Sequence, residues 1–378
     1  MLPDEEQLTP LVQHLKNGGR GLIVCGPEAN NHIAEAVAEL AIKHALPIFA
    51  DPLSQLRAGQ HDKRNIIENY DSLLKSESFK NDYRPDFIIR FGAMPVSKAY
   101  LKWIQQYGDE IDHFVVDRHL SYREPSGVKT KFIWADPEML CNQLVDLVTD
   151  EVRNENWLEF WKSMNVIAKN HMLAEPGEKL NEGHAVVYLA EALPEESVLY
   201  VGNSMPIRDV DSFFMATPKQ IKILANRGAN GIDGVVSSAV GTAASGKRVT
   251  LLLGDLSFFH DMNGLLAAKQ HDIPITIVVI NNNGGGIFSY LPQVEHKDYF
   301  EELFGTPLGI DFLPSVKMYG GSYHRAENWN QYQQALADSY QEDGMSVVEV
   351  ITNRTEHVDF HKAKWKSIEE AILEWRRR

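Results

Sequence analysis

Two polar segments in the C-terminal half of the chain follow long apolar runs, and their oxygen atoms suit a metal ion. Asp255 directly follows the run 249–254 (VTLLLG), and Asn282 is the second residue after the run 275–280 (ITIVVI). Carboxylate and amide oxygens are hard donors, and the backbone carbonyl of Gly284 adds a third. A site with few protein oxygens and open positions suits Mg²⁺, with Mn²⁺ as an alternative, because Mg²⁺ keeps water and phosphate oxygens in its shell.

The residues beside these ligands point to a phosphate-bearing ligand. Gly284, Gly285 and Gly286 let the backbone turn freely and approach phosphates closely. Ser257 and the start of the following helix add donors for an anion. A polar turn rich in asparagine would explain either segment alone. Both segments together favour a diphosphate bridged to the protein by a metal ion.

The elements around these residues bring their polar ends together. We expect strands at 248–254 and 275–281, with a crossover helix at 261–271 between them. Such a βαβ unit is right-handed, so the two strands are parallel and finish at the same edge of the sheet. Ligands of open α/β sheets bind outside these carboxyl ends. The sequence therefore predicts that Asp255 and Asn282 approach each other there.

Basic residues follow two further expected strands. Ser204 and Arg208 lie in GNSMPIRD after the strand 197–202, and Arg227 lies in NRGANGIDG after the strand 221–226. The planar fork of arginine suits bidentate binding of carboxylates. A surface ion pair is the alternative for either arginine alone. Two arginines on converging loops of an acidic protein favour an anionic substrate.

The whole chain alternates strands and helices. This pattern predicts an α/β protein with two doubly wound parallel-sheet domains. We expect a Rossmann-like domain at 1–150, a helical linker at 151–177 and the domain with the polar strand ends at 178–378.

Composition narrows the function further. The formal net charge of −15 argues against nucleic acid as a partner, because no excess of cations is available for phosphates. No apolar run is long enough to cross a membrane. Two cysteines without a partner motif, and no export signal at the start, favour the reducing cytoplasm. We expect the fourteen histidines to form no HxxxH pattern and no His/Cys cluster, which argues against zinc.

The segments GDLSFFHDMNG and INNNGG together resemble the motif of thiamine-diphosphate-dependent enzymes, which begins with GD and ends with NN about one βαβ unit later. In this family an aspartate, an asparagine and a backbone carbonyl hold Mg²⁺ against the diphosphate of the cofactor. The resemblance assigns these roles to Asp255, Asn282 and Gly284. Leu256 departs from the pattern, since many members have glycine there.

GNSMPIRD, NRGANGIDG and NNNGGGIFSYLPQ are most similar to the branch that joins 2-oxoglutarate to isochorismate in menaquinone biosynthesis. Both substrates are dicarboxylates, so the resemblance implies a transferase with cationic and apolar contacts around the cofactor. The implied residues are Ser204, Arg208, Arg227 and Lys98 for substrate, Ile232 for the bent cofactor, and Ile287, Phe288 and Leu291 for an apolar wall. Two alternatives stay open: another 2-oxoacid decarboxylase or ligase, similar to acetolactate synthase, and a non-catalytic diphosphate-binding module.

The resemblance also implies a domain that we do not find in the chain. Family members carry an N-terminal domain whose glutamate activates the cofactor, and the cofactor lies between two subunits. The chain opens into what resembles the middle domain of the family. We therefore expect a truncated part of a homo-oligomeric enzyme, a dimer or tetramer when complete, with negligible turnover by itself.

Overall fold

The fold was analysed in a computed structural model, which describes residues 3, 5–28, 32–149 and 152–377. The chain divides into two compact units. The first comprises Met1–Met172, Met215–Pro218 and Trp365–Arg378, and the second comprises Leu173–Phe214 and Lys219–Lys364. Within the described ranges, no helix is long and apolar enough to cross a membrane.

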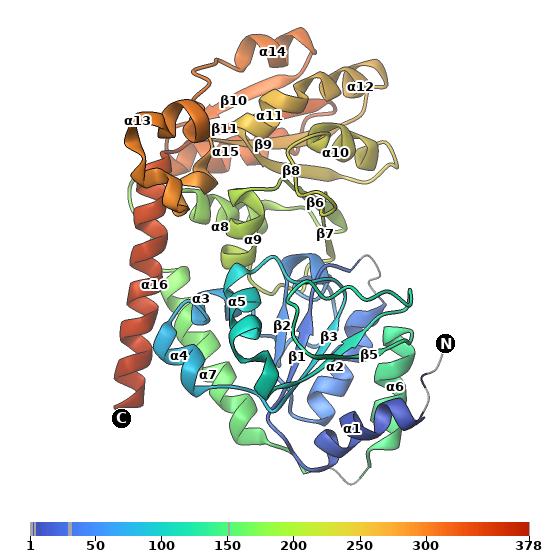
Figure 1. Cartoon of the computed structure of the whole chain (residues 1–378). Helices are drawn as coiled ribbons and strands as arrows, with labels where there is room; N and C mark the ends of the chain where they lie inside the picture. The colour runs from blue at the N-terminus through green and yellow to red at the C-terminus, as the bar shows by residue number, and fades with distance from the viewer. Residues whose placement is uncertain (1–2, 4, 29–31, 150–151, 378) are drawn as a thin grey trace. The chain divides into compact units, whose positions relative to one another are not determined.

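The first unit is built on a five-stranded sheet in the order β2-β1-β3-β4-β5 (Figure 1). Its neighbouring strands all pair in parallel. The strands are β1 (Gly21–Cys25), β2 (Ile48–Ala50), β3 (Phe87–Phe91), β4 (Asp112–Val116) and β5 (Thr130–Ile133). The helices are α1 (Glu5–Lys16), α2 (Ile33–Lys43), α3 (Tyr70–Leu73), α4 (Glu77–Asp82), α5 (Lys98–Tyr107), α6 (Pro137–Leu147) and α7 (Glu155–Met172).

The second unit is built on a six-stranded sheet in the order β10-β11-β9-β8-β6-β7 (Figure 1). All of its neighbouring strands pair in parallel as well. The strands are β6 (Ser197–Val201), β7 (Ile221–Ala225), β8 (Val249–Gly254), β9 (Ile275–Asn281), β10 (Ser322–Ala326) and β11 (Met345–Ile351). The helices are α8 (Glu182–Ala192), α9 (Met205–Phe213), α10 (Val235–Ala243), α11 (Asp255–Asp261), α12 (Leu265–Gln270), α13 (Lys297–Phe300), α14 (Leu313–Met318), α15 (Trp329–Ser339) and α16 (Arg354–Arg376).

Strands β8 and β9 lie in the middle of this sheet and are buried on both faces. Leu251 and Leu253 pack in one hydrophobic cluster with residues of α10, whereas Leu252, which is fully buried, alternates to the other face. Strands that are covered on both faces read as continuous apolar runs. The expected fold class, two α/β units with parallel sheets, is therefore confirmed.

The connection between β8 and β9 differs from the expected single helix at 261–271. Helix α11 begins directly at Asp255, a 3₁₀ turn at Met262–Gly264 interrupts it, and α12 ends at Gln270. Gly264 lies close to the backbone of Ser237, because a Cβ built there would be 3.0 Å from the Ser237 nitrogen. The connection is thus shaped by close packing against α10.

The division into units does not follow the expected ends of the linker. Residues 150 and 151, where the linker was expected to begin, lie outside the described residues. Helix α7 groups with the first unit, because Trp161 packs edge-on against Phe49 and Phe79 there. The last helix, α16, is divided after Lys364.

Candidate active site

A cavity of about 500 Å³ lies at the carboxyl ends of four strands in the second unit. Most of its lining comes from the ends of β6, β7, β8 and β9 and the segments that follow them, and Glu182 of α8 adds to it. Strands β6 and β8 are neighbours, although the chain visits β7 on the other side of β6 between them. Such a reversal of strand order is where open α/β sheets bind ligands.

A hydrogen bond joins Asp255 to the loop after β9 at this edge of the sheet. Asp255 is buried, and its carboxylate accepts hydrogen bonds from the backbone N–H of Leu256 at 2.9 Å and of Gly284 at 2.8 Å. Burial raises the pKa of Asp255 to about 6, although these two hydrogen bonds act in the opposite direction. A buried carboxylate with a raised pKa is stabilised in its charged form by a cation.

Asn282 lies on the neighbouring strand end and presents an amide oxygen without a partner. Its Nδ2 donates to Glu182 at 2.7 Å, while its buried Oδ1 has no hydrogen-bond partner among the described residues. The hydroxyl of Ser257, also buried in the lining, has none there either. Unpaired buried polar atoms are costly, so these two oxygens fit a site that holds a ligand or an ion.

The glycines after Asn282 are required by close packing. Gly284 has φ +140°, and a Cβ there would lie 2.1 Å from the carbonyl oxygen of Gly305. A Cβ on Gly286 would lie 2.9 Å from Nδ2 of Asn282. Because these two glycines have no side chain, the loop can lie close to its neighbours beside the expected metal ligands. The oxygen chemistry and the open lining fit a magnesium ion with a diphosphate.

The two arginines line the same cavity as the metal candidates. Arg208 lies on α9 and donates to the carbonyl of Ser204. Arg227 donates to Oδ1 of Asn203 at 2.7 Å. Ser204 has φ +73°, a backbone conformation that non-glycine residues adopt at a cost. The loop after β6 is thus held in an unusual conformation next to both guanidinium groups.

The apolar candidates divide between the cavity and its surroundings. Ile232, Ile287 and Phe288 line the cavity, whereas Leu291 is not part of the lining. Lys98 is the first residue of α5 in the first unit, so the geometry of this cavity does not test its expected role.

Several lining residues were not singled out from the sequence, and Glu182 and Asn203 are two polar ones among them. Glu182 opens α8, and Asn203 donates from Nδ2 to the carbonyls of Asn226 at 2.9 Å and Gly231 at 2.7 Å. Asn203 directly follows the strand-end Gly202, and this placement was the available signal. Glu182 carried no such signal, because it precedes a strand instead of following one.

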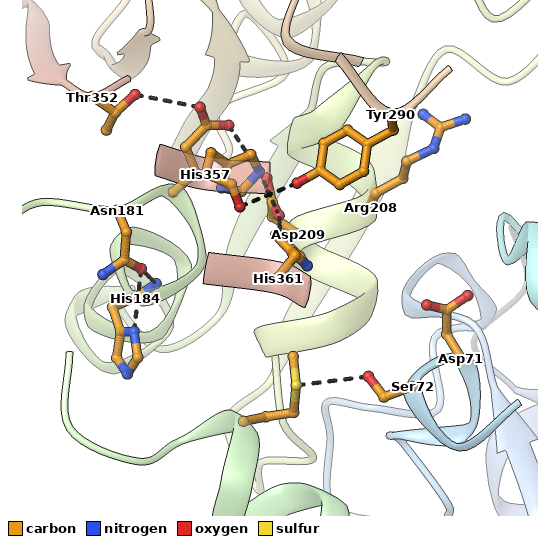
Figure 2. Close-up of polar contacts among 12 residues, drawn as sticks. Asp71, Ser72, Asn181, His184, Arg208, Asp209, Tyr290, Thr352, His357 and His361 are labelled. Atoms are coloured by element: carbon orange, nitrogen blue, oxygen red, sulfur yellow. Dashed lines mark hydrogen bonds and ion pairs between the residues drawn. The ribbon is translucent and has the colours of Figure 1, made fainter. Parts of the chain in front are cut away.

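The expectation that the histidines form no HxxxH pattern is wrong. His357 and His361 have this spacing on α16, and the helix turns both rings toward Asp209 of α9 (Figure 2). The potential ligand atoms of these three buried residues lie within 4.8 Å of one another. Nε2 of His361 lies 2.8 Å from Oδ1 of Asp209, a hydrogen-bond distance. Burial lowers the pKa of His357, but Glu182 and Asp209 outweigh it and raise the pKa to about 9.

Comparison with known proteins defines the class. Residues 4–201 match the family described as the middle domain of thiamine pyrophosphate, and residues 213–350 match the thiamine pyrophosphate enzyme C-terminal TPP binding domain. The chain belongs to this family of thiamine pyrophosphate enzymes. The cavity at the ends of β6, β7, β8 and β9 falls largely within the second match.

Individual relatives carry one shared name. The chain is 52% identical over 368 residues to the 2-succinyl-5-enolpyruvyl-6-hydroxy-3-cyclohexene-1-carboxylate synthase of Oceanobacillus iheyensis. The matched region covers 97% of this chain and 63% of that protein. The chain is 46% identical over 371 residues to the synthase of the same name from Geobacillus thermodenitrificans, with 98% and 63% covered. The chain thus spans a little under two thirds of the length of these relatives.

Proposed function

We propose that the chain acts in a thiamine-diphosphate-dependent transferase that decarboxylates 2-oxoglutarate and adds the four-carbon remainder to isochorismate. The observation that carries the proposal is the convergence of Asp255, Asn282, Arg208 and Arg227 on one strand-end cavity. The shared name of the relatives, at 52% and 46% identity, supports the choice of reaction.

In this proposal the oxygens at the ends of β8 and β9 hold the metal. Asp255 supplies a carboxylate oxygen, Asn282 the Oδ1 to which no described residue donates, and Gly284 its carbonyl, which also accepts from the N–H of Gly286 at 3.0 Å. Gly285 and Gly286 admit the diphosphate, and Ser257 offers it a hydroxyl. Thiamine diphosphate, when bound, supplies the electron sink for loss of CO₂ from a 2-oxoacid.

The remaining lining residues bind and orient the substrates. Arg208 and Arg227 each offer a planar donor fork to a substrate carboxylate, and Ser204 adds a further polar contact from the start of α9. Ile232 supports the bent form of the cofactor, and Ile287 and Phe288 keep water from the reacting carbon. Lys98 as a further substrate contact and Leu291 as part of the apolar wall belong to the proposal as well.

Self-association of the chain as a dimer or tetramer and a place in the cytoplasm complete the proposal. The described cysteines, Cys25 and Cys141, are both free and buried, in keeping with a reducing compartment. Size-exclusion chromatography with light scattering measures the oligomeric state.

The reaction is tested by following 2-oxoglutarate and isochorismate with thiamine diphosphate and Mg²⁺ present. The assay is run with the chain alone and with the chain plus the part of the Oceanobacillus iheyensis relative that it does not match. We expect consumption of both substrates when that part is supplied. Preferential decarboxylation of pyruvate, with 2-oxoglutarate left untouched, would contradict the proposed substrate.

A further inference from the structure

A buried carboxylate holds the amide of Asn282 from the side of α8. Glu182 is 2% exposed, and its Oε1 accepts from Nδ2 of Asn282 at 2.7 Å. The same oxygen accepts from the hydroxyl of Thr352 at 3.3 Å. An ionised carboxylate only accepts hydrogen bonds, so the donor end of the amide must face it. The contact therefore fixes which way the Asn282 amide is turned.

The orientation of this amide decides whether Asn282 can bind a cation. With Nδ2 on Glu182, Oδ1 is turned away from Glu182, and no described residue donates to it. A rotated amide would present two N–H groups in place of that oxygen and would repel a metal ion. The absence of a side chain on Gly286 leaves the space beside Nδ2 that this orientation uses.

A network of buried groups holds Glu182 in turn. Oε2 of Glu182 lies 3.4 Å from Nε2 of His357, which also lies 3.4 Å from Oδ1 of Asp209. Nε2 of His361 lies 2.8 Å from the same Asp209 oxygen (Figure 2). A carboxylate this deeply buried requires a paired cation, and the imidazole of His357 is placed to provide it. Both carboxylate oxygens of Glu182 are thus held, Oε1 by Asn282 and Thr352 and Oε2 by His357.

We propose that Glu182 is a positioning residue, which orients the Asn282 amide so that Oδ1 faces the metal ion of the bound diphosphate. This inference rests on the proposed metal site, and it adds a residue outside the metal ligands to that site. Second partners of this kind orient metal ligands in many proteins, and their loss lowers metal affinity.

Glu349 offers a matched control, because it holds the amide of Asn281, the residue before Asn282. Glu349 is also 2% exposed, and its Oε1 accepts from Nδ2 of Asn281 at 2.6 Å. Glu349 additionally accepts from the hydroxyl of Tyr323. Both acids are buried and both accept from an asparagine amide at the end of β9, but only Glu182 holds the expected metal ligand. A general loss of stability would affect the two variants alike.

The first measurement is Mn²⁺ affinity, followed by electron paramagnetic resonance with thiamine diphosphate present and the unmatched part of the relative supplied. We expect Glu182→Ala to weaken Mn²⁺ binding by about 10- to 100-fold. Glu182→Gln keeps an oxygen that can accept from Nδ2 and should recover most of the affinity. Glu349→Ala should bind Mn²⁺ as the unchanged chain does. Equal affinity in Glu182→Ala and the unchanged chain would overturn the inference.

The second measurement needs no metal. The side-chain amide signals of Asn282 in the ¹⁵N-labelled chain are assigned by their loss in Asn282→Asp. We expect slow hydrogen exchange at this amide in the unchanged chain and in Glu349→Ala, and fast exchange in Glu182→Ala. Unchanged exchange in Glu182→Ala would overturn the inference. If the unchanged chain binds no Mn²⁺, the proposed metal site fails, and the amide measurement still decides whether Glu182 fixes Asn282.

Discussion

The backbone N–H of Gly284 donates to the carboxylate of Asp255 at 2.8 Å, which ties the loop after β9 to the end of β8. The two residues are 29 positions apart in the sequence, and their contact depends on the parallel pairing of β8 with β9. This contact places two of the expected metal ligands side by side.

Asp255→Ala should abolish Mg²⁺-dependent binding of thiamine diphosphate, because it removes the only negative charge among the three expected ligands. Asp261→Ala is the matched control. Asp261 lies on the same helix, is buried, and accepts from the backbone N–H of Ser237 at 2.7 Å. Isothermal titration of the cofactor with and without Mg²⁺, with the unmatched part of the relative supplied, measures the effect. Cofactor binding that is equally strong in Asp255→Ala would refute the assignment.

Arg208→Ala and Arg227→Ala should weaken substrate use while leaving cofactor affinity unchanged. A charge-assisted hydrogen bond contributes about 1.5–3 kcal/mol, which corresponds to a loss of about 10- to 150-fold in kcat/KM. Arg64→Ala serves as a control, since Arg64 forms an exposed ion pair with Asp62. Steady-state kinetics with 2-oxoglutarate, with the unmatched part of the relative supplied, measure the effect. A parallel loss of cofactor affinity would mean that the arginines act on the cofactor instead.

Gly284→Ala should destabilise the second unit more than Gly246→Ala. Both glycines have positive φ, at +140° and +80°, so both substitutions strain the backbone. Only at Gly284 would the new Cβ meet a neighbour, the carbonyl oxygen of Gly305 at 2.1 Å, whereas nothing lies within 4 Å at Gly246. Urea denaturation of both variants measures the difference. Equal losses of unfolding free energy would show that the loop yields freely.

The first unit should lose stability as the pH falls below about 6.5, the usual imidazole pKa. Burial, and then the charge of Arg90, lower the pKa of His113 to about 3. The unfolded chain therefore takes up a proton that the folded unit excludes, so this contribution is complete above pH 6.5 and is lost toward pH 3. One such group changes the unfolding free energy by up to about 1.4 kcal/mol per pH unit.

His113→Leu should flatten this dependence, as measured by urea denaturation at pH 5 and pH 7. His271→Leu, at an exposed position, should leave it unchanged. An identical pH dependence in His113→Leu and the unchanged chain would show that His113 does not exclude the proton.

The strand-end part of the site could be predicted because its signal is local. The runs before Asp255 and Asn282 are apolar since β8 and β9 are buried on both faces, and parallel pairing then places their ends together. Glu182 could not be predicted in this way. It lies 100 positions from Asn282, and its role depends on how α8 packs against α9 and α15 in the folded unit.

Other elements were hidden for related physical reasons. Strand β10 has the sequence SYHRA and lies at the edge of the sheet, where most of its side chains are only partly buried. It therefore lacks the apolar run that marks β8 and β9 in the sequence. The 3₁₀ turn at Met262–Gly264 depends on contact with α10, which no local pattern reports. The spacing of His357 and His361 is visible in the sequence, but only the fold shows that both lie against Asp209 of α9.

The central claim is that the oxygens at the ends of β8 and β9 hold a metal ion. Crystals of the chain grown with Mn²⁺ and thiamine diphosphate, with the unmatched part of the relative supplied, test it through the anomalous scattering of manganese. We predict one manganese ion at about 2 Å from a carboxylate oxygen of Asp255, Oδ1 of Asn282 and the carbonyl of Gly284. Manganese bound elsewhere, with Asn282 still turned so that Oδ1 contacts no ion, would contradict the account.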